Sequence, residues 1–206
     1  MTMDDAAQVV TEQTGKMVIK PQFDAASSFT DGLARVRIDD DEKGNYGFID
    51  KQGKMVIKPQ LAYAGQFADG LAKCCLKLNK DGEGKYGFID KQGEMVIKPQ
   101  FDDAGSFADG LASVRIGDGE TGKWGFIDKQ GKMVIKPQFD AAEQQFADGL
   151  ASVWISDSEA GKWGFIDKQG KMVIKPQFDA AGSFADGLAA VQIGDYETGK
   201  WGFISR

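Results

Sequence analysis

The chain has 206 residues and a net charge of −6, with 25 basic against 31 acidic side chains and no histidine. This acidic balance, without any basic patch, argues against nucleic acid and anionic membranes as partners. The lack of histidine removes most general bases, catalytic triads and zinc sites. No apolar stretch is long enough to insert across a bilayer.

The start of the chain and the cysteines bear on localisation without fixing it. Met1–Val10 contains Asp4 and Asp5 and no apolar run, so we expect no signal peptide there. Cys74 and Cys75 are neighbours, and neighbouring residues of a strand point to opposite faces, so two free thiols are predicted. Free thiols mildly favour a reducing compartment. A cytoplasmic protein and a mature secreted form both remain open.

One unit recurs five times along the chain. The tract Gly-Phe-Ile-Asp-Lys-Gln-Gly-Lys-Met-Val-Ile-Lys-Pro-Gln-Phe returns almost unchanged at intervals of 38 to 40 residues. Its leading glycines are Gly47, Gly87, Gly125, Gly164 and Gly202. A fixed period in this range is typical of repeat architectures. We therefore expect a lead-in over residues 1–14 and a single repeat domain over residues 15–206.

In chain order, the predicted elements begin with a strand at Met17–Gln22. Four complete units follow, and the chain ends with an incomplete unit whose last strand is Trp201–Ile204. Because every element is a short strand bounded by turn residues, the sequence predicts an all-β protein.

Each complete unit is predicted to be a three-stranded antiparallel meander. Leu111–Ile116 alternates apolar and polar residues, as a half-buried strand does. Trp124–Ile127 follows a glycine-closed turn, and a second such turn leads to Lys132–Gln138. Pro137 cannot donate a ladder hydrogen bond, so the third strand ends there or lies on an edge. The connection Asp140–Gly149 is predicted to be partly buried, with room for a helical turn.

The two incomplete ends suggest a closure. The orphan strand at the N-terminus and the two orphan strands at the C-terminus would together make a fifth sheet, which is how a β-propeller closes. The preferred prediction is thus a five-bladed, propeller-like ring. Propeller blades normally have four strands, however, and Gln8–Thr11 could be a worn strand that caps the array. An open β-solenoid or superhelix is the alternative.

Three motifs of the chain resemble the bacterial WG-containing repeat family. They are Lys162–Asp167 (K-W-G-F-I-D), Gly170–Ile174 (G-K-M-V-I) and Phe184–Ala189 (F-A-D-G-L-A). The resemblance covers nearly the whole chain from Gly15 onward, although Tyr replaces Trp at Tyr46 and Tyr86 and the first copy lacks the Trp-Gly pair. It implies a β-repeat protein, commonly extracytoplasmic or part of a multidomain chain, with no general activity attached.

We expect no enzyme, cofactor or metal site. A catalytic pair of carboxylates needs two different environments, whereas the repeated turns supply similar ones. Four turns are acidic, and calcium prefers oxygen clusters, but the spacing fits no known calcium loop and solvated hairpin tips explain the acids equally well. These turns are Asp39–Glu42, Asp118–Glu120, Asp157–Glu159 and Asp195–Glu197.

Two repeated residue sets are candidates for ligand contact. The aromatic residue before each leading glycine could be core or a sugar-stacking platform, with core favoured because Trp124 and Phe126 share a strand face. This set is Tyr46, Tyr86, Trp124, Trp163 and Trp201. An Asp before a Gly ends each connection, where it could set a turn or grip ligand hydroxyls, with the turn favoured. This set is Asp31, Asp69, Asp109, Asp148 and Asp186.

A third candidate set lies on the first strand of each unit, at positions that alternation places outward. These positions differ between copies, which indicates either drift on a solvated face or a partner surface. They are Arg35, Arg37, Lys73, Cys75, Lys77, Ser113, Arg115, Ser152, Trp154, Ala190 and Gln192. Trp154 is the strongest single clue, since an exposed Trp is favoured at interfaces.

The sequence therefore predicts a scaffold that binds rather than catalyses. The leading hypothesis is a protein-interaction module that uses the outward faces of these first strands. The alternative is a multivalent, lectin-like protein that binds glycans at equivalent sites between repeats.

Overall fold

The computed structural model describes residues 15–206 except residues 39–44, 144, 157–160 and 196. The described residues form strands and turns and no helix, so none of them belongs to a helix that could cross a membrane. The predicted lead-in over residues 1–14 lies outside the described residues, and so does the alternative strand at Gln8–Thr11.

The strands form five antiparallel sheets that follow one another along the chain. The first holds β1 (Ala25–Ala26), β2 (Ala34–Ile38), β3 (Asn45–Ile49) and β4 (Met55–Leu61). The second holds β5 (Tyr63–Ala64), β6 (Ala72–Cys75), β7 (Tyr86–Ile89) and β8 (Met95–Phe101). The third holds β9 (Asp103–Ala104), β10 (Leu111–Ile116), β11 (Lys123–Asp128) and β12 (Met133–Phe139). The fourth holds β13 (Ala141–Ala142), β14 (Leu150–Ile155), β15 (Lys162–Asp167) and β16 (Met172–Phe178). The fifth holds β17 (Ala180–Ala185), β18 (Leu188–Ile193) and β19 (Lys200–Ser205).

The first four sheets have four strands each, one more than the sequence predicted. The extra strand is only two residues long and pairs with the first predicted strand of its unit, as β13 pairs with β14. It occupies the connection that we expected to have room for a helical turn, and the described residues there form no helix. A tight turn follows, in which Asp148 and Gly149 both have positive φ and Ala147 bridges to Leu150. Two residues are too few to show an alternating pattern.

The pairing of β11 with β12 explains two repeated residues. The register shifts between Trp124 and Phe126, and a Cβ atom on Gly125 would lie 2.4 Å from the Ile135 carbonyl oxygen. Glycine is therefore required where the two backbones approach. Pro137 lies within β12, which is the edge of its sheet. The edge alternative for the proline strand is confirmed.

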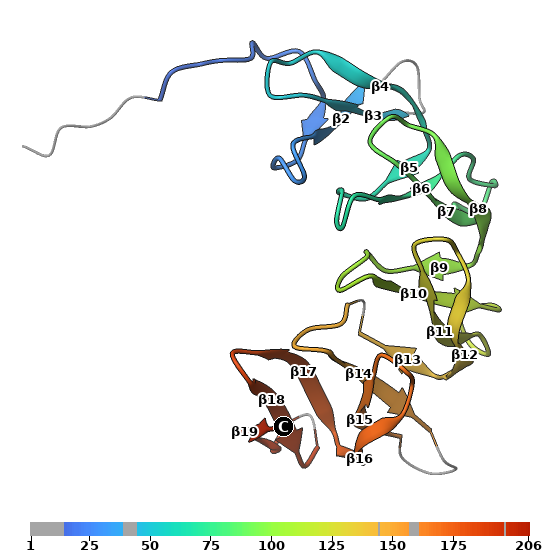
Figure 1. Cartoon of the computed structure of the whole chain (residues 1–206), viewed down its shortest axis with the longest axis vertical. Helices are drawn as coiled ribbons and strands as arrows, with labels where there is room; N and C mark the ends of the chain where they lie inside the picture. Colours follow the sequence, from blue (N-terminus) through green and yellow to red (C-terminus); the bar gives the residue numbers. More distant parts are fainter. Residues whose placement is uncertain (1–14, 39–44, 144, 157–160, 196) are drawn as a thin grey trace, which may run out of the picture.

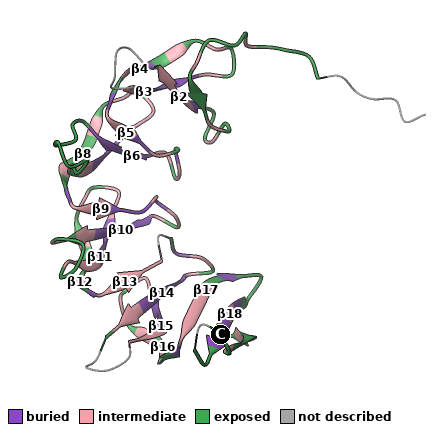
Figure 2. Cartoon of the chain, turned by 180° about the vertical axis from the view of Figure 1, so that it is seen from behind, coloured by how far each residue is buried: buried purple, intermediate pink, exposed green. Residues whose placement is uncertain are grey.

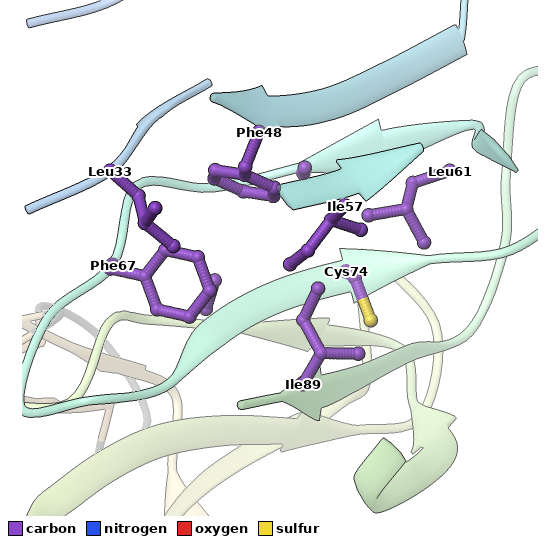
Figure 3. Packing of buried hydrophobic residues seen from close by; sticks show 9 residues of the cluster. Leu33, Phe48, Ile57, Leu61, Phe67, Cys74 and Ile89 are labelled. Carbon is purple, nitrogen blue, oxygen red and sulfur yellow. The ribbon is translucent and has the colours of Figure 1, made fainter. Parts of the chain in front are cut away.

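Successive sheets stack along an arc (Figure 1). Apolar side chains of neighbouring sheets pack together between them. One apolar cluster contains Phe48 of β3 together with Phe67 and Ile89 of the next unit, as Figure 3 shows. The rings of Phe48 and Phe67 meet edge to face, with centroids 4.8 Å apart. The pairs Phe88–Phe107, Phe126–Phe146 and Phe165–Phe184 repeat this contact at the next three junctions. The core is thus a series of similar layers between neighbouring sheets.

The arc is open. The predicted strand Met17–Gln22 belongs to no sheet, and the fifth sheet has three strands with β19 at its edge. The preferred five-bladed closure is therefore not present, and the structure has the open arrangement given as the alternative. Five sheets do not complete a turn, so the N-terminal segment and β19 lie at opposite ends of the arc (Figure 1). Figure 2 shows that both ends carry exposed residues.

Candidate functional site

The outward positions of the first predicted strands are not a solvated face, apart from Lys77, which follows β6 and is exposed. Cys75, Ser113 and Ser152 are at most 1% exposed, and Gln192 is 6% exposed. Arg35 and Lys73 reach across to the next sheet, where each donates a hydrogen bond to a backbone carbonyl, of Ala64 and Ala104 respectively. The prediction of an open binding face is therefore wrong for these residues. Alternation shows that a strand has two faces, but here neighbouring sheets cover both.

The aromatic residues of the Trp-Gly position differ along the arc. Tyr46, Tyr86, Trp124 and Trp163 are half-buried at the margins of the apolar clusters. Trp201, in the last sheet, is 60% exposed. At the second sheet, the Lys73 ammonium lies 4.9 Å from the Tyr86 ring centroid and 5.2 Å from that of Tyr63. The four inner rings are therefore neither fully core nor fully exposed.

The repeated Asp residues set turns and also join neighbouring sheets. All five have φ between 50° and 54°, the left-handed conformation that Asp tolerates in turns. The Asp31 carboxylate accepts a hydrogen bond from Gly70 N–H of the next unit, and Asp69 and Asp148 accept the same bond from Gly110 and Gly187. Asp109 forms an ion pair with Lys168 at 3.3 Å, as Asp31 and Asp69 do with Lys91 and Lys129 at 3.9 Å. The geometry agrees with the favoured turn interpretation.

Two clefts open between sheets at the opposite ends of the strands from these Asp-Gly turns. The first, which we call the Tyr86 cleft, has a volume of about 1020 Å³ and lies between the second and third sheets, bordered by Tyr86, Asp102 and Arg115. The second, the Trp154 cleft, has a volume of about 610 Å³ and lies between the third and fourth sheets. Its lining residues are Asp103, Arg115, Gly119, Glu120, Gly122, Trp124, Asp140, Trp154 and Ser156.

The Trp154 cleft brings together three of the predicted site residues. Trp124, Trp154 and Arg115 all line it, although they come from different strands and two different sheets. Trp154 is half-buried rather than exposed, because its ring lies over the backbone of Gly161. Arg115 donates a hydrogen bond to the Asp118 carbonyl, which holds the guanidinium at the mouth of the cleft. Arg37 lies far from this cleft, in β2 opposite Tyr46.

Sequence reasoning missed the Asp residues that fix the walls of these clefts. Asp140 follows β12 and accepts hydrogen bonds from Lys123 of its own sheet and from Ser156 N–H of the next. These bonds, that of Lys123 first, lower the pKa of the Asp140 carboxyl. At Asp102, burial acts to raise the pKa, but hydrogen bonds from Lys85 and Gly117 N–H outweigh it and the pKa is lowered. The signal was the Asp that follows Gln-Phe in four copies of the repeat, at Asp24, Asp102, Asp140 and Asp179.

The acidic turns are explained in part by their own backbone. The Asp118 carboxylate accepts hydrogen bonds from Glu120 N–H and from Thr121 N–H and hydroxyl, and Asp195 does the same with Glu197 and Thr198. The described residues hold no group of three Cys, Asp or Glu side chains placed for a metal ion. The acidic turns at Asp39–Glu42 and Asp157–Glu159 fall outside the described residues.

Both cysteines are free, as predicted. Burial, together with the neighbouring Cys75, raises the pKa of the Cys74 thiol to about 12. Cys75 donates a hydrogen bond to the Lys77 carbonyl. The Cys74 thiol therefore lacks the lowered pKa that a reactive cysteine needs.

Short antiparallel sheets, stacked in chain order around an open arc with clefts between them, define a propeller-like β-repeat protein. The profile of the WG containing repeat matches residues 12–40, 46–74, 86–119, 124–153 and 163–201. Because these matches cover most of the sequence, the chain belongs to the WG-containing repeat family, and the resemblance inferred from its motifs is confirmed.

One solved structure is similar in fold, and a second aligns with a lower score. A crystal structure of the eukaryotic initiation factor aligns with a TM-score of 0.57 and 11% identity, over 86% of this chain and 49% of that one. TolB from Acinetobacter baumannii aligns with a TM-score of 0.46 and 11% identity, over 84% and 49%. This chain therefore spans about half the length of each. No curated protein sequence matches it.

Proposed function

We propose that the chain is a non-catalytic binding module that takes up a protein partner at the Trp154 cleft. The observation that carries this proposal is that Trp124, Trp154 and Arg115 converge in one open cleft. Trp and Arg are the residue types that most often dominate the binding energy of protein interfaces. Trp124 and Trp154 are held by their sheets, so little conformational entropy is lost when a partner covers them.

The charges around the cleft favour a polar, extended partner. Arg115 lies beside Asp103, Glu120 and Asp140, so the rim presents both signs. The Tyr86 cleft next to it shares Asp103, Arg115 and Gly119 but carries Tyr86 and Leu78 in place of the two Trp side chains. Neighbouring clefts are therefore unequal, which suits a protein partner that crosses several units better than a set of identical ligands.

A glycan is the second candidate, because the same cleft combines aromatic rings with carboxylates. Trp rings stack on the apolar faces of sugars, and Asp103 and Asp140 could accept hydrogen bonds from hydroxyl groups. Lys123 already holds the Asp140 carboxylate, which leaves fewer of its lone pairs for a ligand. For this reason we rank the glycan below the protein partner.

The test is to pan a random-peptide display library against the immobilised chain and to probe a glycan array in parallel. We expect selected peptides whose affinity falls by roughly tenfold or more with Trp154→Ala, the size of effect typical of an interface hot spot. Val173→Ala is the control, because Val173 is 41% exposed on β16 and does not line the cleft. Thermal melts of both variants must show that the fold is retained.

Two outcomes would contradict the proposal. Peptides that bind Trp154→Ala as well as the parent would place the site elsewhere. Glycan binding that Trp154→Ala abolishes, without any selected peptide, would replace the protein partner with the glycan. Trp154→Phe keeps an aromatic ring over Gly161 and separates loss of contact from loss of packing.

A further inference from the structure

The fifth sheet ends in an uncovered strand. In each of the first four sheets the Trp-Gly strand lies between two neighbours, one of which is the seven-residue strand that contains proline. In the fifth sheet the corresponding strand, β19, is the edge. Phe203 is therefore 75% exposed, whereas Phe165 at the same position of β15 is 0% exposed. A free edge with large apolar side chains is a template for the addition of a strand.

The chain contains a second copy of the strand that this edge lacks. Lys16–Phe23 has the same eight residues as Lys132–Phe139 and Lys171–Phe178, yet it belongs to no sheet. The place for it beside β19 is empty within the described part of the molecule. A Cβ atom on Gly164 would lie 2.6 Å from the Ile174 carbonyl oxygen, whereas one on Gly202 would meet nothing within 4 Å.

Lys16–Phe23 is also held as if it belonged to a preceding sheet. In the first three sheets, the isoleucine of the proline-containing strand lies against the turn glycine of the next sheet, so that a Cβ on Gly93 would be 3.3 Å from Ile57. Ile19 has the same relation to Gly53, at 3.1 Å. Ile19 and Phe23 also pack against the apolar cluster of the first sheet. Lys16–Phe23 is therefore packed on the first sheet in the position that the last strand of a preceding sheet would take.

The side chains left over at the two ends complement each other. At interior junctions the Phe of each Trp-Gly-Phe meets a Phe of the next unit, as Phe165 meets Phe184 with ring centroids 5.0 Å apart. Phe203 is the last Phe of the Trp-Gly-Phe motifs. Phe29 is the first of the Phe residues that precede the Asp-Gly turns. Phe29 is 40% exposed and borders a cavity of about 280 Å³ with Ile19 and Phe23. This cavity is where an aromatic ring from a preceding sheet would lie.

We propose that β19 of one molecule pairs with Lys16–Phe23 of a second copy, so that molecules join head to tail. By the register of β15 with β16, Trp201 lies opposite Phe23, Phe203 opposite Ile19, and Ile204 opposite Met17. Phe203 enters the cavity beside Phe29. The partner is a second copy rather than the same chain because the two surfaces lie at opposite ends of the open arc (Figure 1) and Ile19 anchors the segment to the first sheet.

The two surfaces of this contact are different, so it is heterologous. Each added copy covers one end and offers a new one, and the assembly either closes into a ring of copies or continues as a filament. In both cases the assembly grows with protein concentration. The contact repeats a junction that the molecule already makes four times, so it needs no change in the fold of either copy.

A cross-linking experiment tests the contact and its register. Two full-length variants, Met17→Cys and Ile204→Cys, are mixed under mild oxidation. We expect a disulfide-linked heterodimer, identified by mass on a non-reducing gel, whose yield rises with concentration. Val18→Cys mixed with Ile204→Cys is the control, because Val18 points to the other face of the strand, and it should give at least about tenfold less product. The native Cys74 and Cys75 are buried and common to all samples.

The double variant Met17→Cys/Ile204→Cys decides between a second copy and the same chain. Cross-links between chains support the proposal. A disulfide within one chain as the main product at every concentration would show that the arc closes on itself, and would overturn it. A mixed sample with no more heterodimer than the Val18→Cys control would also overturn it.

Analytical ultracentrifugation supplies a measurement without cysteines. The parent should gain mass as its concentration rises, and Phe203→Asp should remain monomeric. Because Phe203 is already exposed, this variant should fold, which a thermal melt can verify. Val173→Asp is the matched control, since Val173 is 41% exposed on β16 but lies away from the ends, and it should associate like the parent. A parent that is monomeric at all concentrations would contradict the proposal.

Discussion

β15 and β19 contain the same five residues, Lys-Trp-Gly-Phe-Ile, in different surroundings. In β15 the phenylalanine, Phe165, is 0% exposed, and Gly164 lies under the backbone of β16. In β19 the phenylalanine, Phe203, is 75% exposed, and Gly202 has open space beside it. The comparison teaches that burial in this protein is a property of the junction between sheets. A residue of the repeat is stabilising only where its neighbours are present.

The largest difference is expected for the two phenylalanines. Phe165→Ala should lower the free energy of unfolding by about 3–5 kcal/mol, the cost of a large cavity in a packed core. Phe203→Ala should change it by less than about 0.5 kcal/mol, as at a surface site. Urea unfolding at low protein concentration, where copies are separate, measures both. Equal losses would show that the last sheet is covered and that the two ends of the arc meet.

The two glycines should differ next. Gly164→Ala places a methyl group 2.6 Å from the Ile174 carbonyl oxygen, and the overpacking should cost about 1–3 kcal/mol. Gly202→Ala should cost less than about 0.5 kcal/mol in the dilute protein, because nothing lies within 4 Å of the new methyl group. Thermal melts of both variants provide the measurement. A Gly202→Ala variant as unstable as Gly164→Ala would place a strand beside β19.

The lysines that precede the Trp-Gly pairs, Lys123 and Lys200, should differ less in their effect on stability, and this difference should depend on pH. Lys123→Ala should lower stability by about 1 kcal/mol at neutral pH, because Lys123 donates to Asp140, and Lys200→Ala should have no effect in the dilute protein. The folded pKa of Asp140 is lowered, so this contribution is present above the ordinary Asp pKa and is lost as pH falls through the folded value. Melts from pH 7 down to below about 4 should show the cost of Lys123→Ala shrinking. A cost that is constant with pH would exclude the ion pair as its cause.

Ser152 offers the smallest effect. Its hydroxyl is buried between the fourth and fifth sheets without a hydrogen-bond partner, and the corresponding residue of β18 is Ala190. Ser152→Ala should therefore raise stability by up to about 1 kcal/mol. Ser113→Ala is the control, because the Ser113 side chain has an interaction partner and should gain nothing. Loss of stability in Ser152→Ala would mean that the Ser152 hydroxyl makes a bond that the static structure lacks.

Much of the fold could be predicted because each repeat carries its own turn chemistry. The meander of three strands, the close approach at Gly125 and the edge position of Pro137 all follow from local residues. The two-residue strands such as β13 could not be seen, since their pairing is fixed by the strand beside them. The covering of both faces of β10, which buries Ser113, was missed for a related reason. Alternation within one strand carries no information on how closely the next sheet approaches.

The candidate site was predictable only as separate residues. Trp124, Trp154 and Arg115 were each singled out, but their meeting in one cleft depends on the stacking of the third sheet on the fourth. The two hydrogen bonds that Asp140 accepts were missed because their donors, Lys123 and Ser156 N–H, lie in different repeats. The Asp after Gln-Phe marks the carboxylate, but nothing in the neighbouring sequence identifies a donor that lies in another repeat.

The most direct test of the difference between β15 and β19 is amide hydrogen exchange measured over a range of protein concentrations. In dilute solution the amides of β15 should be strongly protected and the edge amides of β19 should exchange rapidly, because only β15 has a partner on both sides. As concentration rises, β19 and Lys16–Phe23 should gain protection together. Amides of β19 that are as protected as those of β15 at every dilution would contradict the account.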